Sequence, residues 1–298
     1  MRVIFFGALC AFSTAPLQLL LEAGHDLCAV MLSSGQSIGS RPITPLSPPQ
    51  LTPIPIVDTA ASPSIVSIAW RHQIPIYHIN RLSAAETVDT LARLQAEAAC
   101  VACFPKRIPS ALLGVPRWGF LNVHPSLLPR YRGPYPLFWM LRHGDRRFGV
   151  TIHFMDKQWD SGDIAAQAEV DLPDGFSSAE ADRALSQQGA ELLVDVLRRL
   201  EKDHLTRRAQ PAGGAYFPAP QESDFVIDTA WPAQRAFNFM RGTDNWQRSY
   251  PIEAAGQRFR LKQALFYSSN EILDQPFRLL GEQIDIQFSP GVLRAISA

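Results

Sequence analysis

The chain has 298 residues, of which 46% are hydrophobic and 19% are charged, a composition that excludes wholesale disorder. Its 28 basic and 28 acidic residues give a formal net charge of zero, which excludes a generic polyanion-binding protein. The length predicts one large domain followed by a smaller one. The apolar run at the N-terminus is too short for a signal peptide, and no later run is long enough to cross a membrane. We therefore expect a cytoplasmic protein that does not interact with membranes.

Short apolar runs alternate with amphipathic segments through the first part of the chain. We expect strands at residues 3–6, 27–31, 74–79, 99–104 and 119–124, and helices at 11–21, 65–72 and 84–98. This alternation predicts an α/β fold with a Rossmann-like, mostly parallel sheet and helices on both faces. Only one glycine, Gly7, follows the first strand, so the dinucleotide-binding fingerprint is missing, as is a P-loop. NAD and ATP are therefore poor candidate ligands.

The pattern changes near residue 148. Strand-like runs at 149–155 and 164–170 precede a long amphipathic helix at 177–203. Residues 206–222 are rich in Pro and Gly and are typical of a linker. Residues 223–298 contain one amphipathic helix and strand-like runs at 258–261, 264–267, 283–288 and 292–296. We therefore expect a first domain at residues 1–205 and a small β-rich C-terminal domain, such as a barrel, at 223–298.

The segment Ser33–Ser64 is rich in Ser, Pro and Thr and carries almost no charge. A loop of this length inside a compact domain is usually functional or disordered. Its composition favours disorder slightly over function.

Four cysteines occur in the chain, and two of them, Cys100 and Cys103, have the C-x-x-C spacing of some zinc and redox sites. They lie in a predicted buried strand, where their odd separation points them to opposite faces. No second pair of ligands is nearby in the sequence. We therefore interpret both, together with Cys10 and Cys28, as reduced structural thiols, and we expect no metal site.

Asn122 and His124 lie in a short strand that ends at Pro125. Residues two apart on a strand share a face, and the carboxyl ends of parallel strands are where α/β sheets bind ligands. A neighbouring amide and imidazole can stabilise an oxyanion and move a proton during attack on a carbonyl. The alternative is that Asn122 caps a turn and His124 is a buried, hydrogen-bonded side chain.

The residues that follow favour the catalytic interpretation. The pattern N-x-H-x-S-L-L-P-x-x-x-G begins at Asn122, G-V-T-I-H-x-M-D begins at Gly149, and D-x-G-D-I begins at Asp160. In order and spacing these motifs resemble the folate-dependent formyltransferases, which act on methionyl-tRNA, glycinamide ribonucleotide or amino sugars. The resemblance covers residues 1 to about 205. It continues more weakly into residues 228–246, which look like the start of the C-terminal domain of the methionyl-tRNA enzymes.

The resemblance implies that Asn122, His124 and Asp160 are catalytic and that 10-formyltetrahydrofolate is the formyl donor, with no metal. The Asn122 amide and a protonated His124 would donate hydrogen bonds to the oxyanion. Asp160 would hold His124 in its charged form, or relay the proton of the amine through water. The neighbouring Asp156 and Asp163 are expected to brace the loop.

The resemblance also implies that the pterin ring of the donor lies against the backbone of residues 104–109 and 156–160. The candidate donor-binding residues are Phe104, Lys106, Arg107, Ile108 and Asp156. The methionyl-tRNA enzymes usually carry a glycine and aliphatic residues where this chain has residues 105–107. The candidate acceptor-binding residues are Ser126, Leu127, Leu128, Pro129, Arg130 and Arg132. His153 is expected to be structural.

The acceptor amine is expected to carry phosphate, because residues 106–147 contain eight basic residues and one acidic residue. Both a tRNA and a nucleotide-linked amino sugar fit this charge. The weak resemblance at residues 228–246 favours methionyl-tRNA. The shortness and neutrality of residues 223–298, with eight basic and eight acidic side chains, and the nearly uncharged Ser33–Ser64 segment favour the sugar. A folate-binding homologue without turnover is a third alternative, against which the intact catalytic trio argues.

Overall fold

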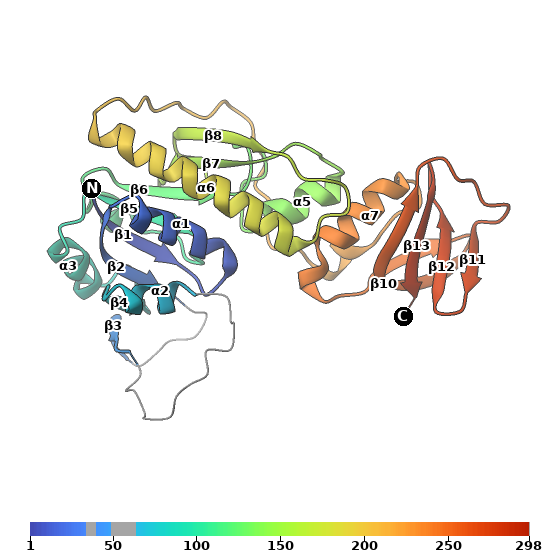
Figure 1. Cartoon of the computed structure of the whole chain (residues 1–298), viewed down its shortest axis with the longest axis horizontal. Helices are drawn as coiled ribbons and strands as arrows, with labels where there is room; N and C mark the ends of the chain where they lie inside the picture. Colours follow the sequence, from blue (N-terminus) through green and yellow to red (C-terminus); the bar gives the residue numbers. More distant parts are fainter. Residues whose placement is uncertain (34–39, 49–63, 298) are drawn as a thin grey trace. The chain divides into compact units, whose positions relative to one another are not determined.

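The computed structural model describes residues 1–33, 40–48 and 64–297 (Figure 1). It divides into two compact units, each of which the chain enters more than once. The first unit comprises Met1–Arg132, Gly149–Glu169 and Leu185–Tyr216, and the second comprises Gly133–Phe148, Val170–Ala184 and Phe217–Ala298. Among the helices in the described ranges, none combines the length and apolar character needed to cross a membrane.

An eight-stranded sheet forms the centre of the first unit, in the order β3-β4-β2-β1-β5-β6-β7-β8. Its strands are β1 (Arg2–Gly7), β2 (Asp26–Leu32), β3 (Ile43–Leu46), β4 (Ile76–Ile79), β5 (Ala98–Ala102), β6 (Phe120–His124), β7 (Phe148–Phe154) and β8 (Ile164–Val170). The five strands from β4 to β6 in this order are parallel, whereas β3 runs antiparallel to β4 and β7 antiparallel to β6. The predicted Rossmann-like, mostly parallel sheet is confirmed.

Two helices, α3 (Ala85–Arg93) and α4 (Ser110–Leu113), cover one face of this sheet. Leu91 of α3 and Leu112 of α4 share a buried cluster with Phe6 of β1 and Phe120 of β6. Because alternate residues of a strand point to opposite faces, Asn122 and His124 project on the same side as Phe120. This cluster therefore supports the strand that carries the candidate catalytic side chains.

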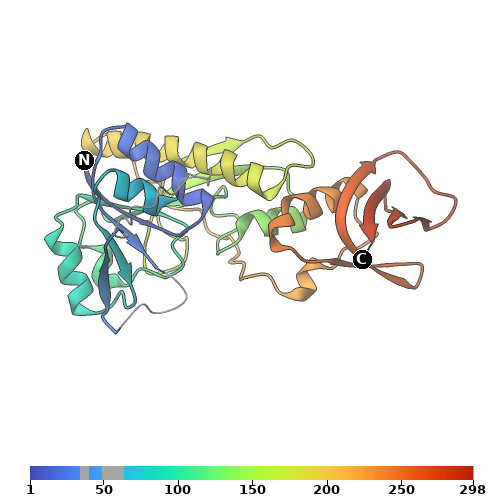
Figure 2. The same cartoon turned by 60° about the horizontal axis from the view of Figure 1, so that its bottom comes forward.

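The opposite face carries α6 (Ser178–Glu201), and Figures 1 and 2 show α1 (Ala11–Glu22) beside it. The part of α6 in the first unit lies close against the sheet. A side chain at Gly189 would come within 2.5 Å of Val123 and 3.1 Å of Val150. The glycine thus permits the helix to pack directly on β6 and β7. The helix that directly precedes β4 in the chain is α2 (Ile65–Arg71).

The predicted loop Ser33–Ser64 is partly outside the described residues, which omit 34–39 and 49–63. Between these gaps the interpretation as a loop is wrong, because β3 pairs with β4 from Ile43 to Leu46. Ile43 is buried and joins the core cluster under α3. Pro45 is tolerated in this strand because β3 lies at the edge of the sheet.

The second unit is built on a five-stranded antiparallel sheet in the order β11-β12-β13-β10-β9. Its strands are β9 (Tyr250–Ala254), β10 (Gln257–Ser268), β11 (Phe277–Leu280), β12 (Gln283–Gln287) and β13 (Val292–Ser297). The rings of Phe259 in β10 and Phe277 in β11 lie 4.9 Å apart although these strands are not neighbours, so the sheet is strongly curled. The predicted β-rich C-terminal region is confirmed.

Two α-helices of the second unit, α5 (Pro136–His143) and α7 (Ala233–Gly242), pack on each other, with the Phe138 and Phe239 rings 5.3 Å apart. Short 3-10 helices occur at Glu222–Phe225 and Asp244–Trp246. Helix α5 was not predicted, although Pro136 at its start and Gly144 at its end, with a φ of 73°, are ordinary helix boundary signals. Strands β9 and β11 were also not predicted, and β10 joins two of the predicted runs.

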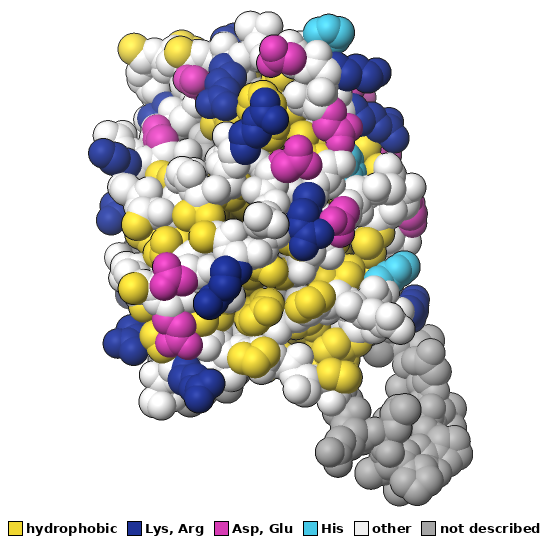
Figure 3. All heavy atoms as spheres, turned by 90° about the vertical axis from the view of Figure 1, so that its left-hand side faces the viewer, with side chains coloured by type: hydrophobic (Ala, Val, Ile, Leu, Met, Phe, Trp, Pro, Cys, Tyr) yellow, Lys and Arg dark blue, Asp and Glu magenta, His cyan; other side chains and the backbone are white. Residues whose placement is uncertain are grey.

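Figure 3 shows one face of the molecule, on which basic and acidic side chains are intermixed. Positive and negative charges therefore lie close to one another on this face, and neither sign forms a large patch there. A surface of this kind does not attract a polyanion strongly.

Candidate active site

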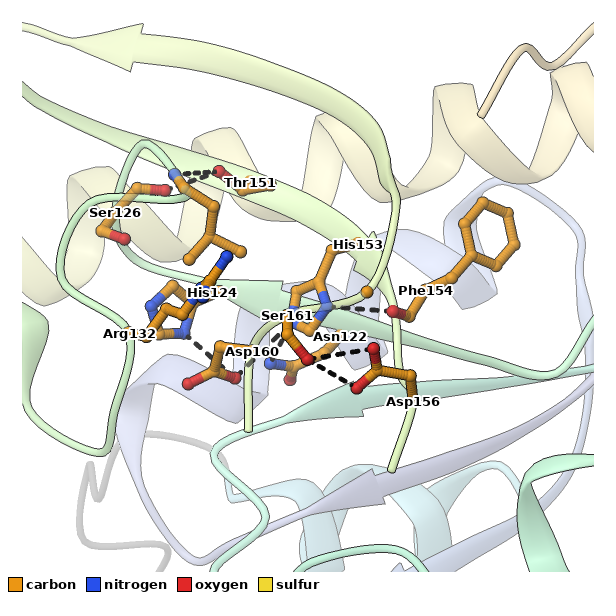
Figure 4. A network of polar contacts seen from close by, with 12 residues as sticks. Asn122, His124, Ser126, Arg132, Thr151, His153, Phe154, Asp156, Asp160 and Ser161 are labelled. Atoms are coloured by element: carbon orange, nitrogen blue, oxygen red, sulfur yellow. Dashed lines mark hydrogen bonds and ion pairs between the residues drawn. The ribbon is translucent and has the colours of Figure 1, made fainter. Parts of the chain in front are cut away.

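The antiparallel pairing of β6 and β7 assembles a cluster of polar side chains (Figure 4). Asn122 lies opposite His153, and His124 lies opposite Thr151. Directly opposite residues of paired strands share a face, so all four side chains project to the same side. The chain thus brings two strand segments that are distant in sequence to one polar site.

The loop after β7 brings Asp160 to this cluster. Its tight fold requires Gly162, because a side chain there would lie 1.8 Å from the Phe154 carbonyl oxygen. The Phe154 amide donates to the Asp163 carbonyl at 2.9 Å, which closes the loop onto the end of β7. Asp160 adopts the left-handed conformation, with a φ of 51°, which aspartate tolerates better than most residues.

The Asp160 carboxylate is buried between two imidazole rings, as Figure 4 shows. Its Oδ1 atom lies 3.7 Å from His124 Nδ1 and 3.6 Å from His153 Nε2. These separations are longer than a normal hydrogen bond but short enough for a strong charge interaction. A proton on either ring nitrogen would therefore be stabilised by this carboxylate.

Burial favours the neutral form of His124 in this site. Its Nε2 atom lies 3.0 Å from the Tyr131 carbonyl oxygen, which can only accept, so Nε2 carries the proton. Burial lowers the pKa of His124 below its usual value of 6.5 and outweighs the opposing effect of Asp160. The lowered pKa runs against the expectation of a protonated His124. Its Nδ1 atom instead presents a lone pair and can act as a base.

His153 orients the Asn122 amide. Its Nδ1 atom donates to the Phe154 carbonyl at 3.1 Å, which leaves Nε2 to accept a hydrogen bond of 3.1 Å from Asn122 Nδ2. An amide nitrogen has two N–H groups, and only one can point at His153. The other is directed elsewhere and can stabilise an oxyanion. His153, predicted to be structural, thus contacts two of the three candidate catalytic residues.

Two of the candidate acceptor-binding residues, Ser126 and Leu128, are buried and stabilise their own loop. Ser126 Oγ donates to the Arg130 carbonyl at 2.7 Å. The Thr151 hydroxyl donates to the Ser126 carbonyl at 2.6 Å and accepts from the Leu128 amide at 3.1 Å. This loop is therefore attached to β7 through one threonine.

The other four residues of this set differ in exposure. Leu127 packs over Gly149, because a Cβ atom added at Gly149 would lie 2.6 Å from Leu127 Cδ2. Pro129 is half-buried, and Arg130 is exposed with its guanidinium 5.5 Å from the Tyr131 ring centre. Arg132 donates from Nε and Nη2 to Gln210 at 3.2 and 2.6 Å. Arg130 is thus the cation of this set that faces solvent.

Gln210, from the predicted linker, holds the Asp160 loop in place. Its Nε2 atom donates to the carbonyl oxygens of Asp160 and Gly162, each at 2.8 Å. Arg132 binds the amide oxygen of the same side chain, which fixes its orientation. Gln210 was not predicted, because no local motif marks a residue whose hydrogen-bond partner lies 50 positions away.

The candidate donor-binding residues lie on two loops that contact each other. Arg107 Nη1 reaches the Lys157 carbonyl at 3.5 Å, which joins residues 104–109 to residues 156–160. Lys106 Nζ donates to the carbonyls of Ile79 and Asn80 at 3.3 and 3.0 Å. The loop that follows β5 and the loop that follows β7 therefore contact each other through Arg107 and Lys157.

The remaining members of this set anchor the two loops. The Phe104 ring packs edge-on against Phe6 at 5.2 Å, and the Ile108 side chain is only 1% exposed. Asp156 accepts from the Ser161 hydroxyl at 2.8 Å and from the Gln158 amide at 2.8 Å. The described ranges contain no group of three or more His, Cys, Asp or Glu side chains arranged to hold a metal ion.

Comparison with known proteins gives matches along most of the chain. Residues 52–197 match the family model described as formyl transferase. The methionyl-tRNA formyltransferase of Chloroflexus aurantiacus is 32% identical over 272 residues, which cover 91% of this chain and 82% of that protein.

Solved structures share the fold over the whole chain. An N-formyltransferase from Helicobacter canadensis, crystallised with folinic acid and dTDP-3-aminofucose, aligns with a TM-score of 0.68 at 14% identity and covers 100% of this chain and 99% of its own. HypX from Aquifex aeolicus, crystallised with tetrahydrofolic acid, aligns with a TM-score of 0.62 at 18% identity, covering 99% of this chain and 43% of its own. At these identities the likeness establishes a common fold.

Proposed function

The chain belongs to the formyltransferase family, and we propose that it transfers the formyl group of 10-formyltetrahydrofolate to the amino group of methionyl-tRNA. The observation that carries this proposal is the cluster of Asn122, His124 and Asp160, of which the last two are buried. It combines an amide donor, a neutral imidazole and a carboxylate at the end of β6. The acceptor is supported by the methionyl-tRNA formyltransferase of C. aurantiacus, which aligns with 91% of the chain.

The proposed mechanism needs no covalent enzyme intermediate. As the neutral amine attacks the formyl carbon, negative charge develops on the formyl oxygen, and the second N–H of Asn122 donates a hydrogen bond to it. His124 Nδ1 accepts the proton that the attacking nitrogen loses. Asp160 stabilises the resulting imidazolium. His124 then returns this proton to the folate nitrogen as its bond to carbon breaks, and the ring is neutral again.

The proposed donor site is the edge formed by residues 104–109 and 156–160. Among the described residues, no backbone-to-backbone hydrogen bond involves residues 104–108, so their N–H and C=O groups suit the polar edge of a pterin. Phe104 and Ile108 are fixed in the core, which keeps this backbone in position. We propose that Lys106, Arg107 and Asp156 support this edge through the contacts described above.

Arg130 is the proposed phosphate-binding residue for the acceptor. It is exposed and adjoins Tyr131, whose carbonyl accepts the His124 hydrogen bond. Other basic residues of the 106–147 segment bind groups of the protein itself. Arg132 binds Gln210, and Arg142 donates to the Val226 carbonyl at 2.8 Å and lies 4.6 Å from the Trp231 ring. The charge available to an acceptor is therefore smaller than the sequence count indicates.

A nucleotide-linked amino sugar is the second candidate acceptor. The observation that favours it is the balance of eight basic and eight acidic residues in 223–298, where a tRNA-binding domain would carry an excess of positive charge. A sugar nucleotide presents only a few phosphates and needs fewer cations.

The test is an assay with 10-formyltetrahydrofolate and either charged initiator methionyl-tRNA or a dTDP-linked amino sugar, following release of tetrahydrofolate. We expect formylation of the tRNA, with binding that weakens steeply with salt, by about −0.9 in the log-log slope for each duplex phosphate neutralised. Turnover of the sugar without formylation of the tRNA would replace the proposed acceptor. Failure of both acceptors to release tetrahydrofolate would overturn the proposed donor chemistry.

A further inference from the structure

The four cysteines fall into two chemically different pairs. Cys28 and Cys100 are buried, and burial raises the pKa of their thiols to about 11 and about 12 respectively. Cys10 and Cys103 are exposed. Because the thiolate is the reactive form of cysteine, only the exposed pair is suited to chemistry.

The sheet brings the exposed pair together. The neighbouring parallel strands β1 and β5 end side by side, with Gly7 opposite Ala102. Cys103 follows Ala102 directly, and Cys10 lies at the start of α1. Ser13 links the two ends, because its hydroxyl donates to the Ala102 carbonyl at 2.9 Å and lies 3.4 Å from Cys10 Sγ.

The surroundings of Cys10 stabilise its thiolate. A hydrogen bond from the Cys103 thiol is the main cause that lowers the pKa of Cys10 to about 6, against the opposing effect of burial. Cys10 is also the N-cap of a twelve-residue helix, whose dipole favours negative charge at that end. The lowered pKa favours the Cys10 thiolate, which is the attacking species in thiol–disulfide exchange.

We propose that Cys10 and Cys103 form a redox modification site that closes to a disulfide when it meets a low-molecular-weight disulfide. The Cys10 thiolate attacks one sulfur of the small disulfide, whose S–S bond breaks and releases one thiolate. That thiolate takes the proton of Cys103. The Cys103 thiolate then attacks the Cys10 sulfur and displaces the second small thiolate, which takes a proton from water. Two electrons pass from the protein to the small disulfide, which leaves as two reduced thiols.

Two other uses of these cysteines fit the structure less well. A zinc site needs three or four protein ligands, and the described part of the chain offers no such group. Pairing of Cys103 with Cys100, which the C-x-x-C spacing indicates, is opposed by the complete burial of Cys100 within β5. The proposed partner of Cys103 is instead Cys10, which follows the neighbouring strand β1.

The expected consequence rests on the proposed function. Cys103 directly precedes Phe104, where the proposed donor-binding loop begins. A disulfide to Cys10 would tether this loop to the start of α1. We therefore expect the oxidised protein to show a raised KM for the formyl donor, reversed by a reducing dithiol.

The test is incubation of the reduced full chain with oxidised glutathione, followed by peptide mapping. We expect wild-type protein to give a Cys10–Cys103 disulfide without retained glutathione. The Cys103→Ala variant should retain one glutathione on Cys10, and the Cys100→Ala control should behave as wild type. Separate glutathione adducts on Cys10 and Cys103 of the wild type, or no reaction of either, would overturn the site.

Kinetic measurements then test whether the Cys10–Cys103 disulfide changes the KM for the formyl donor. Donor KM is measured for oxidised and re-reduced wild-type protein and for Cys10→Ser, which cannot close the disulfide. A raised KM confined to oxidised wild type supports the tethering of the loop. A mapped disulfide with an unchanged KM would overturn the effect, while failure of formyl transfer in the reduced protein would count against the proposed function alone.

Discussion

Two buried aspartates, one in each unit, have opposite surroundings. Asp285 in β12 is 1% exposed and accepts hydrogen bonds of 2.6 Å from both Arg278 and Arg294, which hold its pKa below the usual range. Asp160 is 9% exposed and faces His124 and His153 at 3.7 and 3.6 Å. Arginine is always charged, whereas imidazole gains charge only when it takes up a proton. The surroundings of Asp285 therefore suit a stabilising role, and those of Asp160 suit the proposed proton transfer.

Replacing each aspartate by asparagine tests this comparison and has the largest expected effects. Asp160→Asn should lower kcat by about 10²- to 10⁴-fold, because the imidazolium loses its counter-charge, with little change in unfolding free energy. Asp285→Asn should cost about 1–3 kcal/mol in unfolding free energy, because three hydrogen bonds from arginine lose their anionic acceptor. Formyl transfer and urea unfolding of both variants are the measurements. The comparison fails if Asp160→Asn loses stability and keeps its turnover.

Asn122→Ala sharpens the account of the polar cluster. Removal of one oxyanion donor should lower kcat by about 10²- to 10³-fold. Donor affinity should be nearly unchanged, because the proposed pterin contacts lie on other loops. The exposed Asn270 provides the matched control, and Asn270→Ala should keep wild-type kinetics. A loss of donor affinity without a fall in kcat would place Asn122 in the donor site instead.

Gln210→Ala tests whether the Asp160 loop needs external support. Loss of two hydrogen bonds to the loop carbonyls, worth about 1 kcal/mol each, should lower kcat by about tenfold. Gln187→Ala, on the exposed side of α6, is the control. A variant with wild-type kcat would show that the loop holds its own conformation.

The pH profile gives the smallest expected effect. Burial lowers the pKa of His124 below 6.5, the usual pKa of histidine. The base should therefore stay active as the pH falls to 6.5, and the acid limb of kcat/KM should lie below that pH. Asp160 raises this pKa, so Asp160→Asn should move the limb to still lower pH. An acid limb above pH 6.5 in the wild type would contradict the neutral ring.

The parts that sequence could predict are those encoded locally. The strand from Phe120 to His124 and the position of Gly162 follow from alternation and from a glycine motif. The role of His153 required the antiparallel register of β6 and β7, which no local pattern reveals. Gln210 and the pairing of Cys10 with its partner likewise depend on contacts between distant segments.

The charge state of His124 was also beyond the sequence, because it depends on the balance of two opposing effects. A neighbouring carboxylate raises its pKa, and burial lowers it by more. The sequence pattern identifies Asp160 as the partner of His124 but does not show how deeply His124 is buried. The proposed role of the ring as a base, and not as a charged donor, therefore rests on the burial that the structure shows.

The most direct test of the central claim is a double-mutant cycle on formyl transfer with His124→Ala and Asp160→Asn, with His204→Ala as an exposed control. If Asp160 acts by stabilising the proton that His124 accepts, the double variant should be scarcely slower than the slower single variant. If the two losses multiply instead, the residues act independently, and the proposed proton transfer through a coupled His124 and Asp160 is wrong.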